Sequence, residues 1–452
     1  MFKALKRDRA FYGYLLRLTG PIALQNLITF SLGLIDTLMV SQLGNNEMAA
    51  VTAANVPVFL LISIVFGVQS GVGILISQYW GKKDLPSISR AIGVAAGLGV
   101  ALALVIALAL FLWPVQIMDL MSNKHHLSLL GAPYLRVIGF SYVFNMLSSI
   151  YVSAQRSVEN ASFGMKLFGM STVLNTGMNY LLIFGKCGFP MLGVEGAAIA
   201  TFISQLVGGV LPVFYFLNKR STSSIHLGRA QWNGGVIRSA CINGSSELMT
   251  NLSMSLVNIL YNYQLLRFAG ENGVAAYGVI MYAAFLFVAV FVGYAVGSAP
   301  IVSYHYGARN HAELNNLYSK SLRLIGVIAV VMTALSMLVI PYVARIFVGY
   351  DAELLALTSH AFRVYALNFF LMGFNVYGSS FFTALGDGVT SALISFLRTL
   401  LFQLLALIFL PMVLGIEGVW LAVTAAEAGA LCVTVLMFIT KDKVFHYRKA
   451  SC

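Results

Sequence analysis

Three acidic residues lie in long apolar segments of the chain, at Asp36, Glu247 and Glu427. A carboxylate in the middle of a lipid bilayer costs about 2.5–3.5 kcal/mol on insertion scales, so an acid kept there is a functional candidate. The chemistry open to it is the uptake and release of H⁺ or Na⁺. Gln25 and Thr29 share one helical face with Asp36, at i, i+4 and i+11. This stripe favours a cation site at Asp36, and the alternative is a structural carboxylate bonded to a neighbouring helix.

Two amides, Asn175 and Asn179, are spaced at i and i+4, with Ser171 or Thr172 one turn earlier. Amides in a membrane helix are, taken alone, typical of helix–helix contacts. Beside a carboxylate they would supply neutral oxygens for Na⁺, or hydrogen bonds that set when the acid is protonated. Taken by itself, this pair therefore leaves a helix contact and a cation site both open.

The longest polar stripe begins at Glu247. It continues at Asn251, Ser255, Asn258 and Asn262. Because such a stripe cannot face lipid, it must line a cavity or a helix interface.

Glu427 has no matching stripe beyond Thr424, so a structural role is as plausible for it as a functional one. Asn368, Asn375 and Ser379 share a helical face that predicts either a cavity wall or a helix contact.

The composition of the chain predicts which kind of secondary structure carries these residues. Of 452 residues, 59% are hydrophobic and only 10% are charged, with a mean hydropathy of +0.84. A soluble domain carries about 25% charged residues, so the chain is predicted to be an all-α polytopic membrane protein. The four cysteines have no metal-ligand spacing, and there is no phosphate-binding loop and no HExxH motif. We therefore expect neither an enzyme nor a cofactor.

Twelve apolar segments are each long enough to cross the roughly 30 Å hydrocarbon core as a helix. Lys and Arg are concentrated on one set of alternate loops and both ends, which predicts a multi-pass protein of the cell membrane with cytoplasmic termini. This placement also explains the net charge of +12 without nucleic-acid binding. The approximate segments are 14–40, 51–79, 90–113, 130–155, 163–185, 191–217, 235–265, 273–304, 320–347, 358–386, 389–413 and 415–440.

The chain also contains an internal repeat. When the sequence is aligned with itself at an offset of 226 residues, Gly67, Gly71 and Gly81 coincide with Gly293, Gly297 and Gly307. At a slightly smaller offset of 222, LGVEGAAIA at 192–200 coincides with LGIEGVWLA at 414–422. Duplication explains these matches better than the abundance of glycine does. It predicts an N-terminal lobe at 1–218, a cytoplasmic linker at 219–238 and a C-terminal lobe at 239–452. Six spans per lobe give parallel repeats, an arrangement used by transporters that bind substrate between the halves.

These features resemble the multidrug and toxic compound extrusion (MATE) family over essentially the whole chain. The resemblance rests on Pro21 and Asp36 in GPIALQNLITFSLGLIDTLMVSQLG, on GVQSGVGILISQYWGKKD, on LNTGMNYLLIFGKCGFPMLGVEGAAIAT and on the paired lobes. It implies two six-helix lobes related by a pseudo-two-fold axis in a V shape, and export of cationic amphipathic compounds in exchange for Na⁺ or H⁺. It also implies that Asp36 is the coupling carboxylate, on a helix that Pro21 allows to bend, with Asn175 and Asn179 as its neighbours at a site where Na⁺ could bind. Glu247 would match the second-lobe acid. For a cationic substrate, Glu247 is then expected to hold the positive charge, together with Tyr277 and Tyr282 through cation–π attraction.

Two features depart from the family pattern. Some members carry Asp where this chain has Asn179, and an acid of the tenth span is absent here. The expected function is a multidrug antiporter that works as a monomer in lipid, without an obligate protein partner. The alternative is a flippase for a lipid-linked saccharide, which would need more Lys and Arg inside the spans than Arg398.

Overall fold

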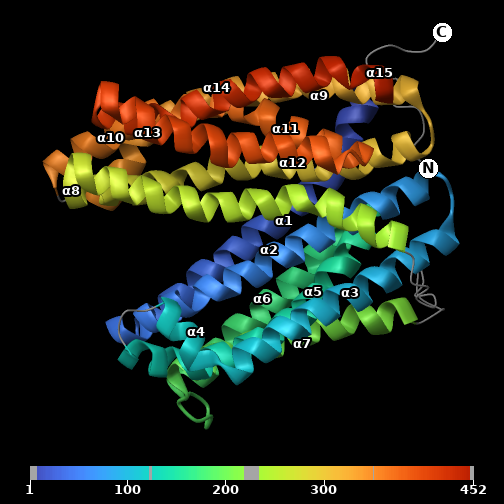
Figure 1. Cartoon of the computed structure of the whole chain (residues 1–452). Coiled ribbons are helices and arrows are strands. Elements are labelled where there is room, and N and C mark those ends of the chain that lie inside the picture. Colours follow the sequence, from blue (N-terminus) through green and yellow to red (C-terminus); the bar gives the residue numbers. More distant parts are fainter. Residues whose placement is uncertain (1–7, 122–124, 218–233, 350, 448–452) are drawn as a thin grey trace. The chain divides into compact units, whose positions relative to one another are not determined.

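The computed structural model describes residues 8–121, 125–217, 234–349 and 351–447, and these residues form helices with no strand among them. Figure 1 traces the helices in chain order. The helices of the first half are α1 (Asp8–Ser41), α2 (Asn45–Gly81), α3 (Leu85–Leu112), α4 (Pro114–Met121), α5 (His125–Ser157), α6 (Ala161–Phe184) and α7 (Gly193–Leu217). Those of the second half are α8 (Gly234–Gly307), α9 (His311–Val348), α10 (Ala352–Ala366), α11 (Phe369–Leu385), α12 (Gly388–Phe396), the π-helix η1 (Leu397–Leu401), α13 (Phe402–Leu414), α14 (Ile416–Thr440) and α15 (Asp442–Phe445).

The all-α membrane architecture predicted from composition is confirmed. Ten helical stretches of the described residues are long and apolar enough to cross a membrane, and α10 with α11, bent by 46°, makes an eleventh. One of the ten, α8, contains two predicted spans, because Gly270 has φ 62° and ψ −152° and the chain reverses there (Figure 1). Only glycine adopts this backbone conformation readily.

The chain divides into two compact units. The first comprises Leu16–Gly244, and the second comprises Ser245–Cys452 with Met1–Leu15. Of the predicted linker at 219–238, residues 219–233 lie outside the described residues, and 234–238 form the first turn of α8. In the first unit α5 packs against α2, α3 and α7. In the second, α11 packs against α9 and α14, and Trp420 and Phe362 are buried in the core.

The backbone repeats as the sequence does. The larger repeat offset relates Lys83 to Arg309, and these residues have φ values of 61° and 54°. The residue after each of them, Asp84 or Asn310, caps the following helix through its side chain. The positive-φ glycines Gly193 and Gly415 are related by the smaller offset. Both offsets therefore mark equivalent turns in the two halves.

Glycines provide the closest helix contacts. A Cβ on Gly71 of α2 would overlap the carbonyl oxygen of Ala240, and one on Gly244 would overlap the carbonyl oxygen of Gly67, so the GxxxG pair of α2 packs directly on the first turns of α8. A Cβ on Gly196 would lie 2.6 Å from the Leu182 carbonyl oxygen.

We expect Gly196→Ala and Gly418→Ala each to destabilise the protein by about 1–3 kcal/mol, because backbone atoms would have to move. These two glycines are equivalent in the repeat, and a Cβ on Gly418 would overlap the Leu410 carbonyl group. Gly278→Ala on α8 is the matched control, since nothing lies within 4 Å of the position that its Cβ would take. Thermal unfolding of the purified variants measures the difference, and equal unfolding temperatures for all three would contradict this account.

Candidate functional site

Two helices of the first unit, α1 and α6, bring Asp36, Asn175 and Asn179 together. Asn179 Nδ2 on α6 donates to Asp36 Oδ1 on α1 at 2.5 Å and to Asn175 Oδ1 at 2.9 Å. Asn175 Nδ2 in turn donates to Thr201 Oγ1 on α7 at 3.2 Å. The side chains of both asparagines are buried, whereas Asp36 is partly accessible. An acid at the edge of such a cluster can exchange a cation with water while its amide partners stay fixed.

Two oxygens converge on one point of this cluster. Asp36 Oδ1 and Asn175 Oδ1 both accept from Asn179 Nδ2, while Asn179 Oδ1 is buried without a hydrogen-bond partner among the described residues. A turn of this one amide would direct a third oxygen toward the same point. Carboxylate and amide oxygens are ligands of hard cations, and a protonated Asp36 would find an acceptor there.

The α7 residues of the cluster were not predicted from the sequence. Thr201 and Ser204 face Asn175, and Ser204 Oγ accepts from its Nδ2 at 3.5 Å. Their i, i+3 spacing directly after LGVEGAAIA is the signal that could have found them. Pro21 lies inside α1, half-buried and on the same helix as Asp36.

The second set of predicted site residues, all on α8, is only partly connected by hydrogen bonds. The side chain of Glu247 lies outside the described residues, and its backbone is part of α8. Tyr277 Oη donates to Asn258 Oδ1 at 3.0 Å, and Asn262 Nδ2 donates to the Asn258 carbonyl oxygen. Tyr277 is buried and stacks on Tyr261 with ring centroids 4.8 Å apart.

Two further members of this set are the partly buried Asn251 and the exposed Tyr282 on α8. Tyr282 is 66% exposed, so its ring face is available to a ligand, unlike the stacked ring of Tyr277. That these tyrosines hold a cationic group stays a prediction.

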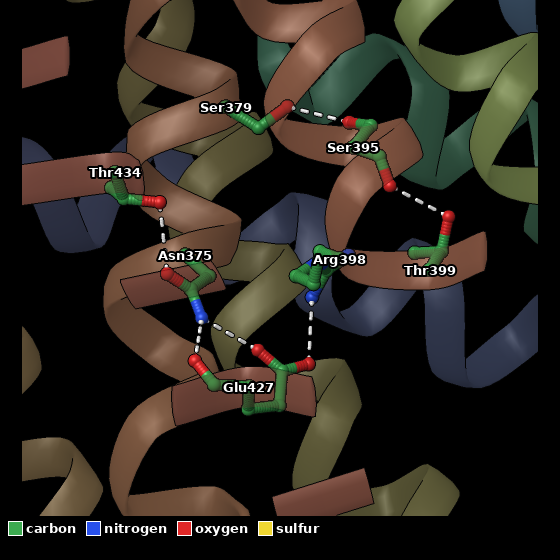
Figure 2. A network of polar contacts seen from close by, with 7 residues as sticks. All are labelled: Asn375, Ser379, Ser395, Arg398, Thr399, Glu427 and Thr434. Carbon is green, nitrogen blue, oxygen red and sulfur yellow. Dashed lines mark hydrogen bonds and ion pairs between the residues drawn. The ribbon is translucent and has the colours of Figure 1, made fainter. Parts of the chain in front are cut away.

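A second buried carboxylate centre lies around Glu427 of α14, for which the sequence left a structural and a functional role open. Figure 2 shows Asn375 of α11 and Arg398 of η1 directed at this carboxylate from two sides. Asn375 Nδ2 donates to Glu427 Oε2 at 2.7 Å and to its carbonyl oxygen at 2.9 Å. Arg398 Nη1 lies 3.4 Å from Glu427 Oε1. Thr434 Oγ1 donates to Asn375 Oδ1 at 2.9 Å, which fixes the orientation of the amide.

Five hydroxyl groups form a buried cluster near this centre. Ser379 and Thr383 of α11, Ser391 and Ser395 of α12, and Ser246 of α8 contact one another at 2.5–3.2 Å. Ser395 precedes Arg398 by one helical turn, as Figure 2 shows. Of these residues only Ser379 stood out in the sequence.

Known membrane transporters resemble the chain over both of its halves. The MatE family model matches residues 21–181 and 248–408, once in each half. The multidrug export protein MepA of Staphylococcus aureus (strain MSSA476) is 22% identical over 434 residues, which are 94% of this chain and 93% of MepA. The uncharacterized transporter YisQ and the probable multidrug resistance protein YoeA of Bacillus subtilis are both 28% identical, and the chain spans only 48% and 43% of their lengths.

Solved structures show the same fold. A MATE crystal structure in complex with MaL6 superposes with a TM-score of 0.88 and 22% identity, covering 96% of each chain. A transporter of the MOP superfamily from Pyrococcus furiosus, described as having a binding pocket of reversed polarity, superposes with a TM-score of 0.86 and 22% identity over 95% of this chain and 96% of its own. Because the family model matches well over half of the residues, the resemblance noted in the sequence is confirmed: this chain belongs to the MATE family of membrane transporters.

Proposed function

We propose that the protein is a secondary active antiporter, which exports cationic amphipathic compounds in exchange for Na⁺ or H⁺. The observation that carries the proposal is the Asp36 cluster, in which a partly accessible carboxylate on a membrane helix faces two buried amides. The name of MepA, a multidrug export protein matched over nearly its full length, supports the choice of substrate class.

The mechanism requires only that the ion and the substrate prefer opposite states. Na⁺ or H⁺ neutralises Asp36 and changes its hydrogen bond with Asn179, which alters the contact between α1 and α6. If the cationic substrate favours the state in which Asp36 is charged, each ligand lowers the affinity for the other by the same factor. An ion gradient then drives export.

The flippase alternative would need a cationic site for a pyrophosphate. Arg398, the residue that the sequence offers for this role, is buried and already engaged by Glu427. One buried arginine does not make a cationic cavity, and this favours the antiporter over the flippase.

Inverted membrane vesicles test the proposal. Ethidium should enter vesicles that contain the protein when either a Na⁺ or an H⁺ gradient is imposed, with each gradient applied separately, and it should not enter without a gradient. Uptake that depends on neither gradient, or that requires ATP, would contradict antiport.

In the same vesicles, Glu247→Gln should weaken uptake of cationic dyes more than that of neutral ones. An equal loss for both kinds of dye would show that Glu247 does not recognise the charge of the substrate.

A further inference from the structure

The ion pair between Arg398 and Glu427 is incomplete. A guanidinium and a carboxylate that are fully matched make two parallel contacts at about 2.7–2.9 Å. Here a single contact of 3.4 Å is made, and Arg398 Nε is buried without an acceptor among the described residues. Glu427 is 1% exposed, and Arg398 is 8% exposed. Because mutual attraction offsets the cost of burying two charges only when the geometry is good, this pair is poised to separate.

The helix that carries Arg398 contains an irregular turn. Residues Leu397–Leu401 form a π-helix, in which the Phe402 N–H bonds to the Leu397 carbonyl oxygen. A π turn holds one residue more than an α turn and is frequently found at functional sites. Its conversion to an α turn would shift Arg398 around the helix axis by one residue and would withdraw the guanidinium from Glu427.

The partner that can replace Arg398 is a proton. A metal cation needs neutral oxygen ligands beside the carboxylate, and the neutral side chain that contacts Glu427 among the described residues is Asn375, whose N–H group cannot coordinate a cation. A proton instead removes the charge of the carboxylate. Tyr365 of α10 is the other titratable group near Glu427. Among the described residues, α11, α12 and α13 contribute no further charged side chain in contact with the carboxylate.

A polar route leads toward this centre from the turn between α11 and α12. The route is the hydroxyl cluster, which runs from Thr383, beside that turn, to Ser395, one turn from Arg398. At the turn, Asp387 caps α12 and pairs with Lys441 at 2.8 Å. Burial alone would raise the pKa of Asp387, but hydrogen bonds from Lys441 and Thr390 hold the pKa below its usual value, so the entrance is ionised.

We propose that Glu427 is a second proton-binding site of the transport cycle, at which H⁺ and the Arg398 guanidinium compete for one carboxylate. A proton from water forms an O–H bond with Glu427 Oε1, and Arg398 leaves with its charge. The C-terminal unit then carries one more positive charge than before, which disfavours a cationic substrate. Release of the proton to water restores the pair and the affinity for substrate. The inference rests on the proposed antiport function and adds a site to it.

Proton release on substrate binding tests the inference. Ethidium is added to the purified full-length protein in weakly buffered detergent solution containing saturating Na⁺, and a pH indicator measures the protons released per ethidium bound. The double variant Glu427→Gln/Arg398→Gln, which keeps the site neutral overall, should release about one proton fewer than the wild type. Asp36→Asn, which is not expected to complete an export cycle, leaves this pair untouched and should still release about one proton for each ethidium that it binds.

The exposed pair of His360 and Glu417, 2.7 Å apart, provides the matched control, and its double Gln variant should release as many protons as the wild type. An unchanged count in Glu427→Gln/Arg398→Gln, or no release from Asp36→Asn, would overturn the inference. The Asp36→Asn result decides the matter even where the double variant does not fold. Gradient-driven ethidium export by the wild type is measured in parallel. If the wild type shows no such export, the antiport function is rejected. If it does export ethidium but the double variant releases as many protons as the wild type, only the second proton site is rejected.

Discussion

Asp36→Asn should abolish ion-driven export while the protein still inserts and folds. The amide has nearly the same size as the carboxyl group and can stay in contact with Asn179, so the packing of α1 on α6 is kept. It cannot be protonated and has no charge to attract Na⁺. The attraction of a unit charge pair at 4 Å is about 4 kcal/mol at an effective dielectric constant of 20, so ion affinity should fall by about a thousandfold. Ethidium uptake in vesicles under either gradient should match that of vesicles without the protein.

Two further variants sharpen this result. Glu353→Gln removes an exposed acid from the first turn of α10 and should leave export unchanged. Thr201→Val keeps the shape of the side chain but removes the oxygen that receives Asn175, so it should reduce export partially, by about 10–100-fold. Full drug resistance of cells that express Asp36→Asn at normal levels would show that the coupling ion binds elsewhere.

Arg398→Met should destabilise the protein by about 3–5 kcal/mol at neutral pH, because it leaves the buried Glu427 carboxylate without a counter-charge. The loss should become smaller as the pH falls, since a protonated Glu427 needs no counter-charge. Thermal unfolding of the purified variant at several pH values measures both effects.

A double-mutant cycle separates the ion pair from the packing around it. Arg398→Met/Glu427→Gln should recover most of the stability lost in Arg398→Met, because no buried charge remains and the new amide oxygen can still accept from Asn375. Glu427→Gln alone should cost less than Arg398→Met, since the pair is made through one long contact and the new amide oxygen can still accept from Arg398. Additive losses in the double variant would show that the two side chains do not interact.

The two carboxylate centres differ in how far the sequence reveals them. The polar stripe of Asp36 and the i, i+4 spacing of Asn175 and Asn179 are visible in the sequence, but nothing in it states that residues 143 positions apart touch. Their role came from the resemblance to a family. Glu427 has no polar stripe, because its partners lie on other helices, 29 and 52 residues away. A periodic pattern along one helix cannot show such a centre.

The sequence by itself determined the membrane helices, the repeat and the turns that mark it. Apolar runs of about 20 residues have few alternatives to a membrane helix, because a backbone in lipid must satisfy its own hydrogen bonds. The two repeat offsets return as equivalent positive-φ positions, at Lys83 and Arg309 and at Gly193 and Gly415.

The tertiary structure decided which polar groups meet. It placed Thr201 beside Asn175, and it placed Arg398 on a π-helix against Glu427. No proline or glycine marks that π-helix in the sequence, so it was not predicted. The physical reason is that contacts within one helix depend on residue spacing alone, whereas a buried polar group takes whichever partner the packing of neighbouring helices brings within reach.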